Sequence, residues 1–290
     1  MDGRKIAQEI KNELKSKVEA LKRQGVVPGL VAVIVGENPA SVIYVRNKAK
    51  ACQELGLNSE VIQLPESTTE KELIRRVLEL NQNKKFHGIL VQSPLPFHIN
   101  QFNIFATVDR SKDVDGFHPY NLGMLFLGTP IFVPCTPLGI QELLMRSGND
   151  PAGKNVVILG RGNIVGKPLA ALLLQKAKGA DATVTICHRG TSNLPEVTRT
   201  GDILVVAIGN ANFVSADMVK PSAVVIDVGI NSIPDPATGK NKLLGDVDFG
   251  QVSKIASAIT PVPGGVGPMT IAMLLHNTIK AAEIQNSIKD

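Results

Sequence analysis

Short apolar runs alternate along the chain with longer segments in which apolar residues recur at helical spacing. The runs are rich in β-branched residues, as buried strands of parallel sheets are, and the longer segments have the periodicity of amphipathic helices. The first series comprises a helix over 4–23, the strand "GLVAVIVG" (29–36), a helix over 41–55, the strand "NSEVIQL", a helix in "TTEKELIRRVLELN" and the strand "FHGILVQ". This alternation predicts an α/β fold with a parallel sheet covered by helices.

A second series of alternating strands and helices follows an interval in which this alternation stops. The interval contains "SPLPFHINQF", "DRSKDVDGFHPYNLG" and "VPCTPLG", whose Pro, Gly and Asp content predicts loops. The second series runs through "NVVILG", a helix from about 163, "ATVTIC", "DILVVAIG", "AVVIDVG" and a final helix over roughly 268–288. We therefore predict two α/β domains, 1–120 and 121–267, with a C-terminal helix, 268–290, that returns to the first domain.

The composition indicates an ordinary folded protein. Apolar residues make up 43% of the 290 residues, the start lacks an apolar signal region, and no window approaches about 18 uninterrupted apolar residues. We expect a cytoplasmic protein without membrane segments. The three cysteines, Cys52, Cys135 and Cys187, lack the spacing of metal ligands, so we expect reduced thiols and no metal site.

The net charge of +5 narrows the class of ligand. Lys and Arg are scattered along the chain, without the basic run or zinc pattern of nucleic-acid-binding proteins, so we do not expect nucleic acid as a partner. Modest positive charge also suits polyanionic small ligands, such as a phosphorylated dinucleotide or a glutamate-tailed cofactor.

A glycine-rich turn joins strand and helix in "VVILGRGNIVGKPLAALLL". Gly160, Gly162 and Gly166 allow backbone N–H groups to approach a pyrophosphate at the helix N-terminus, although this spacing also occurs in ordinary strand-to-helix turns. After the next strand, where an NAD enzyme usually offers an acidic residue to the ribose, the chain has His188 and Arg189. A cation there pairs with a 2′-phosphate, so the sequence favours NADP over NAD unless Arg189 is only a solvated loop residue.

One lysine stands out in the helix predicted over 41–55. At about 100° per residue, the apolar face of this helix is formed by Ser41, Tyr44, Val45, Lys48, Ala49, Cys52 and Leu55, whereas Arg46, Asn47 and Lys50 point elsewhere. An ammonium on such a face either extends past it to water or is buried. Burial favours the neutral amine, which acts as a base near neutral pH, with Tyr44 one turn away to hydrogen-bond it. Periodicity alone does not choose between the two.

Three further polar residues are candidates for a site. Gln92 ends the strand "GILVQ", so its amide is expected at the carboxyl end of the sheet. Asp113 and Asp115 lie in the loop "KDVDGF", where a carboxylate can accept hydrogen bonds from amide and ring N–H donors of a ligand. No His, Ser or Cys arrangement forms a catalytic pattern, and we expect His87, His98, His118 and His276 at the surface or at helix caps.

Taken together, these segments resemble one family along essentially the whole chain, the bifunctional methylenetetrahydrofolate dehydrogenase/methenyltetrahydrofolate cyclohydrolases. The resemblance rests on an ordered set of motifs: "SVIYVRNKAKACQELG", "GILVQSPLP", "KDVDGFHPYNLG", "PCTPLG", "GRGNIVGKP", "GDILVVAIG", "VIDVGIN", "GDVDF" and "PVPGGVGPMT". It implies an N-terminal catalytic domain and a Rossmann-like NAD(P)-binding domain with a cleft between them. It also implies NADP-dependent oxidation of 5,10-methylenetetrahydrofolate to the methenyl form and hydrolysis to 10-formyltetrahydrofolate, within the one-carbon metabolism that serves purine biosynthesis.

The resemblance also implies roles for individual residues. The family's catalytic Tyr and Lys fall on Tyr44 and Lys48, its glutamine on Gln92 and its pterin-binding aspartate on Asp115. Lys48 is then the proton shuttle or base for the attacking water, with Gln92 tuning it and Tyr44 positioning the ring. The expected further contacts to substrate come from Ser41, unless it only caps its helix, and from Pro263, Gly264 and Gly265. The expected contacts to cofactor come from Gly160, Arg161, Gly162, Gly166, Thr185, His188, Arg189 and Ile230.

Two departures from the family pattern concern the cofactor. Many relatives carry Ser where Gly162 stands, so a hydroxyl contact to phosphate is missing and affinity depends more on Arg161 and Arg189. Arg189 is Ser in some relatives, and a basic pair can also hold an inorganic anion beside NAD. The resemblance implies a homodimer through the second domain, and no ATP-dependent step because the ligase domain of some relatives is lacking.

Three alternatives stay open at this point. The chain could be a family member that kept hydrolysis and lost oxidation, which Gly162 makes conceivable. It could be another NADP dehydrogenase on a two-domain scaffold, although that class gives no reason for Tyr44, Lys48, Gln92 and Asp115 to occur together. It could also be a basic protein that uses a Rossmann-like domain to bind nucleic acid or to regulate.

Overall fold

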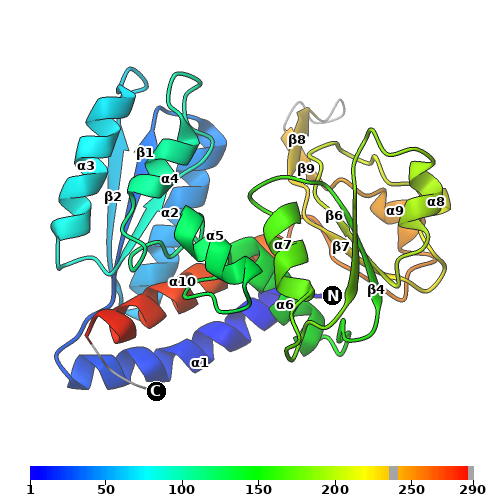
Figure 1. Cartoon of the computed structure of the whole chain (residues 1–290), viewed down its shortest axis with the longest axis horizontal. Coiled ribbons are helices and arrows are strands. Elements are labelled where there is room, and N and C mark those ends of the chain that lie inside the picture. Colours follow the sequence, from blue (N-terminus) through cyan, green and yellow to red (C-terminus); the bar gives the residue numbers. More distant parts are fainter. Residues whose placement is uncertain (235–240, 287–290) are drawn as a thin grey trace. The chain divides into compact units, whose positions relative to one another are not determined.

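The structure, a computed structural model, describes residues 1–234 and 241–286 and shows two series of alternating strands and helices (Figure 1). The first series consists of α1 (Gly3–Arg23), β1 (Gly29–Val35), α2 (Pro39–Leu55), β2 (Asn58–Leu64), α3 (Glu70–Gln82), β3 (Gly88–Val91), α4 (Gln101–Thr107) and α5 (Pro119–Phe126). The second consists of α6 (Cys135–Arg146), β4 (Asn155–Leu159), α7 (Gly166–Leu173), β5 (Thr183–Cys187), α8 (Leu194–Thr198), β6 (Ile203–Val206), η1 (Ala216–Met218), β7 (Val224–Asp227), β8 (Asn231–Pro234), β9 (Asn241–Leu244), α9 (Phe249–Val252), β10 (Ala258–Ile259) and α10 (Val266–Gln285).

The chain divides into two compact units. We call residues 9–135 with 271–290 the N-terminal unit, and residues 136–270 with 1–8 the C-terminal unit. The chain therefore changes unit within the Pro- and Gly-rich interval, although not at residue 120. The predicted domain limits, which concern the parts that bind folate and NADP, stay a prediction, and their residues 235–240 and 287–290 lie outside the described residues.

The N-terminal unit contains a parallel sheet of strand order β2-β1-β3. Every residue of β1 and β3 is buried, as expected for strands covered on both faces. One face packs its valines against α3 and α4, and the apolar residues of α3 recur at helical spacing as Leu73, Val77 and Leu80. The helix α2 follows β1 directly and contacts β1 and β2, which places its first turns next to the carboxyl end of the sheet (Figure 1).

The C-terminal helix returns to the N-terminal unit, as predicted. From α10, the side-chain amide of Asn277 donates to the carbonyl oxygen of Val114 at 2.8 Å. Near the end of α10, Gln285 donates to the carbonyl oxygens of His87 and Ser111, both at 2.8 Å. These bonds link residues more than 160 positions apart in the sequence, so the helix holds the start of β3 and the segment between α4 and α5 in place.

The C-terminal unit is Rossmann-like and contains a parallel sheet of strand order β10-β7-β6-β4-β5. Its core consists of apolar residues from the strands and from the segments that cross between them. The strand β4 pairs with β5 on one side and with β6 on the other, so the order of strands reverses there. In open α/β sheets such a reversal creates a crevice at the carboxyl ends of the two strands. The α/β class and the parallel sheets predicted from the sequence are thus confirmed.

A helix begins within each of three segments predicted as loops, α4 at Gln101, α5 at Pro119 and α6 at Cys135, so the loop prediction was wrong for the residues that these helices include. Asn100 caps α4 through its side-chain oxygen, and His118 caps α5, whose first residue is Pro119. Proline is tolerated in a first turn because its missing N–H would be unpaired there in any case. The helix expected from about 163 begins at Gly166. Among the described residues, we find no helix long and apolar enough to cross a membrane.

Candidate functional site

The side chain of Lys48 is buried in the N-terminal unit, with only 4% of its surface exposed. Its ammonium donates to the side-chain oxygen of Gln92 at 3.1 Å and lies 4.6 Å from the centre of the Tyr44 ring. The neighbouring cations Arg46 and Lys50 are exposed. The helical periodicity allowed Lys48 to be either buried or exposed, and the structure shows that it is buried.

Burial lowers the pKa of Lys48, since the interior disfavours the charged ammonium, and the charge of Asp115 opposes this shift. Burial likewise raises the pKa of Asp115, and the charge of Lys48 opposes that shift. Desolvation is the larger effect for both groups, so each is charged less readily than in water, and the opposite charge of the other group offsets this only partly.

Gln92 is oriented by its own surroundings. Its amide nitrogen donates to the carbonyl oxygen of Ser93 at 2.6 Å, so its oxygen is the atom that faces Lys48. The residue follows β3 directly and so lies at the carboxyl end of the sheet, where the sequence placed it. A fixed neutral acceptor holds the amine without adding a charge that would keep it protonated.

The structure separates the two aspartates of the "KDVDGF" loop. Asp113 is buried and accepts hydrogen bonds from the backbone N–H groups of Phe117 and His118 and from the side chain of Asn121. Its oxygens thus order the turn that leads into α5. Asp115 is partly exposed and interacts electrostatically with Lys48. Of the two, only Asp115 is placed together with the candidate catalytic residues.

Ser41 does not cap its helix. The cap of α2 is Asn38, whose side-chain oxygen accepts from the backbone N–H of Ser41 at 3.1 Å. Ser41 lies in the first turn and is buried, on the same helical face as Tyr44 and Lys48. Its hydroxyl is therefore not used for capping.

The glycine-rich turn lies in the C-terminal unit at the reversal of strand order. A β-carbon at Gly160 would overlap the carbonyl oxygen of Ala207, which follows β6, and one at Gly166 would overlap the carbonyl oxygen of Gly160. Both positions therefore require glycine, because the backbones approach too closely for a side chain. At Gly162 a β-carbon would meet no heavy atom of the described residues within 4 Å, so that glycine is not required by packing. The turn leads into the N-terminus of α7, where N–H groups favour an anion.

Two arginines accompany this turn. Arg161 contacts the ring of His188 at 3.0 Å, and Arg189 donates to the carbonyl oxygen of Ile208 at 3.3 Å. Both arginines are exposed, so their guanidinium groups are accessible to a phosphate. Thr185 lies earlier, in the middle of the edge strand β5, and is exposed. Ile230 is 59% exposed just before β8.

The predicted substrate loop at 263–265 belongs to the C-terminal unit rather than to the unit of Lys48. It packs against the N-terminus of the chain, where a β-carbon at Gly3 would overlap the carbonyl oxygen of Gly265. The structure thus forms two groups of candidate residues, one around Lys48 in the N-terminal unit and one around the glycine turn in the C-terminal unit.

The sequence did not identify the buried carboxylates Asp227 and Asp246 of the C-terminal unit as functional candidates. Asp227 ends the buried strand β7, and Asp246 is fully buried and accepts hydrogen bonds from the loop after β6. A usable signal existed, because an acidic residue at the end of a continuous apolar strand, as in "VVID", is rarely left without donors.

Two family models match the chain. The tetrahydrofolate dehydrogenase/cyclohydrolase catalytic domain matches residues 1–115, and the NAD(P)-binding domain of the same family matches residues 134–286.

Individual relatives agree with these matches. A protein of Prosthecochloris aestuarii described as bifunctional protein FolD is 57% identical over 285 residues, which cover 97% of both chains. A crystal structure of the bifunctional enzyme FolD from Campylobacter jejuni superimposes with a TM-score of 0.92 at 50% identity, over 98% of both chains. A Trypanosoma brucei methylenetetrahydrofolate dehydrogenase-cyclohydrolase, complexed with NADP and an inhibitor, superimposes with a TM-score of 0.93 at 40% identity, over 100% of this chain and 98% of that one.

Proposed function

The chain belongs to the tetrahydrofolate dehydrogenase/cyclohydrolase family, and from that premise we propose how its residues perform two reactions. The protein oxidises 5,10-methylenetetrahydrofolate to the methenyl form with NADP and hydrolyses the methenyl form to 10-formyltetrahydrofolate. The observation that carries the assignment of residues is the buried ammonium of Lys48, held by the side-chain oxygen of Gln92.

Lys48 acts in hydrolysis as a base and then as an acid. A water molecule adds to the cationic carbon between N5 and N10, and the neutral amine of Lys48 accepts the proton that the water loses. When the bond from that carbon to N5 breaks, Lys48 returns the proton to N5, and the hydroxyl oxygen loses its remaining proton to solvent as the C=O bond of the formyl group forms. A lowered pKa makes the neutral amine available near neutral pH, and its cause here is burial.

The residues around Lys48 bind and orient the substrate. Gln92 holds the amine through a neutral acceptor, and the Tyr44 ring, 4.6 Å from the ammonium, positions the folate ring. Asp115 accepts hydrogen bonds from the ring N–H groups of the pterin, which neutral side chains would bind more weakly. Ser41 and the backbone of Pro263, Gly264 and Gly265 supply further contacts to the substrate.

The C-terminal unit binds the cofactor. When bound, NADP accepts a hydride from the bridging carbon of the substrate. The close-packed turn at Gly160 and Gly166 brings backbone N–H groups to the pyrophosphate, and Arg161 and Arg189 pair with the 2′-phosphate. Contacts from Gly162, Thr185, His188 and Ile230 complete the cofactor site, and NAD binds less well because it lacks the phosphate.

A substitution of Lys48 tests the assignment. Lys48→Met keeps the unbranched chain up to the ε-carbon and removes the amine, and we expect the hydrolysis of methenyltetrahydrofolate to fall by about 10²–10⁴-fold with unchanged affinity for NADP. Lys50→Met is the matched control, because Lys50 lies on the exposed side of the same helix and pairs with Glu54 at 3.8 Å. Decay of the methenyl compound is followed spectrophotometrically, and retained turnover in Lys48→Met would refute the base assignment.

We further propose a homodimer formed through the C-terminal unit and a cytoplasmic location, where the 10-formyl product serves purine biosynthesis. The edge strand β5 supports the homodimer proposal, because among the described residues it pairs only with β4 and its Ile186 is 40% exposed. The buried free thiols of Cys52, Cys135 and Cys187 agree with a reducing compartment. Sedimentation equilibrium would give the mass of a monomer if the dimer proposal is wrong.

A further inference from the structure

The loop after β6, residues 207–210, lies at the reversal of strand order in the C-terminal unit. On one side, the carbonyl oxygen of Ala207 packs against Gly160 of the phosphate turn. On the other, the carbonyl oxygen of Ile208 accepts the hydrogen bond from Arg189. Gly209 and Asn210 are exposed. The loop therefore contacts both the turn and the arginine that the proposed function assigns to NADP.

One buried carboxylate holds this loop. One side-chain oxygen of Asp246 accepts from the backbone N–H groups of Ile208 at 2.8 Å and Gly209 at 2.9 Å. The other accepts from the backbone N–H of Asn210 at 2.8 Å and from the side chain of Asn231 at 2.8 Å. The side chain of Asp246 is fully buried. Three consecutive backbone N–H groups thus point inward to one residue, so the loop conformation depends on it.

A second carboxylate fixes the backbone of Asp246. One oxygen of Asp227 accepts from the backbone N–H of Asp246 at 2.9 Å, and the other accepts from that of Val247 at 2.9 Å. The approach is too close for side chains on the flanking residues: a β-carbon at Gly245 would overlap the Asp227 carboxylate, and one at Gly229 would overlap that of Asp246. The backbone of Asp246 is therefore held by hydrogen bonds at the end of β7 and does not move with residues 208–210.

We propose that Asp246 is a positioning residue for NADP: it holds residues 208–210 in the conformation that supports the phosphate turn and aims Arg189. The inference rests on the proposed function, since it concerns the same cofactor. Asp246 belongs to the C-terminal unit, which also contains the glycine turn and Arg189, so we expect its effect on cofactor binding.

The substitution Asp246→Asn tests the need for two acceptor oxygens. An asparagine side chain has one oxygen, so in either orientation its NH₂ group faces two N–H donors that the carboxylate oxygen had bound. Either the backbone N–H groups of Ile208 and Gly209 or that of Asn210 then lose their acceptor oxygen. We expect the Kd for NADP to rise by at least about tenfold, because buried donors left unpaired disfavour the bound loop conformation.

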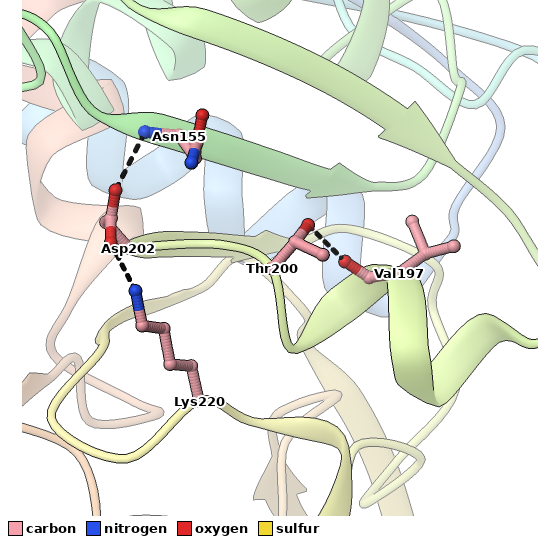
Figure 2. Close-up of polar contacts among 5 residues, drawn as sticks. All are labelled: Asn155, Val197, Thr200, Asp202 and Lys220. Carbon is pink, nitrogen blue, oxygen red and sulfur yellow. Dashed lines mark hydrogen bonds and ion pairs between the residues drawn. The ribbon is translucent and has the colours of Figure 1, made fainter.

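Asp202 provides a matched control at the other end of β6, the strand that leads into the loop. It precedes β6, at the opposite end from the loop, and accepts from the backbone N–H of Asn155 at 2.9 Å and from Lys220 at 2.7 Å (Figure 2). Asp202→Asn therefore makes the same chemical change in a carboxylate of the same sheet that also accepts a backbone N–H. It lies at the amino end of the strands, away from the cofactor turn, so we expect its Kd for NADP to stay unchanged.

The experiment is titration calorimetry of NADP with the full chain and both variants, together with hydrolysis of the methenyl compound measured without NADP. The proposal predicts that Asp246→Asn raises the Kd and the KM for NADP but leaves kcat at saturating NADP and the rate of hydrolysis unchanged. Asp202→Asn should change none of these quantities. Unchanged affinity in Asp246→Asn, or an equal loss in both variants, would overturn it. A wild type that hydrolyses but binds no NADP would overturn the proposed cofactor as well, which separates the two failures.

If Asp246→Asn does not fold, as shown by the absence of a cooperative melt, the proposal is tested with Asn231→Leu instead. That change removes one side-chain donor to Asp246 and leaves the three backbone donors in place. We expect the Kd for NADP to rise about threefold with hydrolysis retained. An unchanged Kd in a folded Asn231→Leu protein would overturn the proposal.

Discussion

A carboxylate in place of the Gln92 amide should shift the pH dependence of hydrolysis. In Gln92→Glu, a negative charge would stand where the amide oxygen now lies, 3.1 Å from the Lys48 ammonium. At an effective dielectric constant of about 20, two unit charges at that separation attract by about 5 kcal/mol, equivalent to a rise of about four pKa units. The charge thus reverses the effect of burial, which lowers the pKa of Lys48 in the wild type.

The consequence for the rate follows from the population of the neutral amine. Each unit by which the pKa exceeds the pH reduces that population tenfold, so we expect hydrolysis at pH 7 to fall by at least about 100-fold and to recover by one order of magnitude per pH unit above it. Glutamate also loses the donor that Gln92 offers to the Ser93 carbonyl oxygen, which lowers the rate at every pH but does not change the slope.

The assay measures the initial rate of methenyltetrahydrofolate decay from about pH 6 to about pH 9, and the uncatalysed rate is subtracted at each pH. Gln92→Met is the control, because it removes the acceptor without adding a charge and should not move the profile to higher pH. A Gln92→Glu profile parallel to that of the wild type would show that Lys48 does not limit hydrolysis as a base.

Three further predictions concern the cofactor and the scaffold. Replacing Arg189 with Asp should weaken NADP far more than NAD in binding titrations, and an equal loss for both would mean that the 2′-phosphate is bound elsewhere. Lys112 is buried and donates to two carbonyl oxygens at the end of α3, at 2.8 and 3.3 Å, so Lys112→Met should lower the free energy of unfolding by on the order of 2 kcal/mol in urea titrations; an unchanged midpoint would contradict this. The neutral His87 ring accepts from the Gly29 N–H at 3.1 Å, and burial lowers its pKa below the ordinary 6.5. Its stabilising effect is therefore present above pH 6.5 and lost as the pH falls, so the Tm difference between wild type and His87→Gln should shrink on acidification, whereas a constant difference would exclude this linkage.

The strands β1, β3 and β6 were predictable because each is a continuous apolar run that is buried throughout, and burial on both faces of a parallel sheet needs no more specific pattern. The short helices α4, α5 and α6 were not, because their segments are rich in residues that also form loops. Whether Asn100 caps a helix or begins a turn depends on what the following residues pack against, and local composition does not contain that information.

The candidate site shows the same division between local and distant information. Helical periodicity placed Lys48 on the face of Ser41 and Tyr44, but the choice between burial and exposure depends on Gln92, 44 residues further along the chain. Asp113 and Asp115 lie in one loop and are chemically alike, and only the folded chain shows that Asp113 binds backbone N–H groups while Asp115 interacts electrostatically with Lys48.

The sequence by itself determined the alternation of strands and helices, the glycine turn and the residue types that chemistry needs, because these depend on spacing along the chain. The tertiary structure alone decided which polar groups are buried and which donors they meet. Asp246 shows why: its partners at 208–210 are 36 to 38 residues away. A buried carboxylate is stabilised only by donors in direct contact with it, and folding brings those donors together.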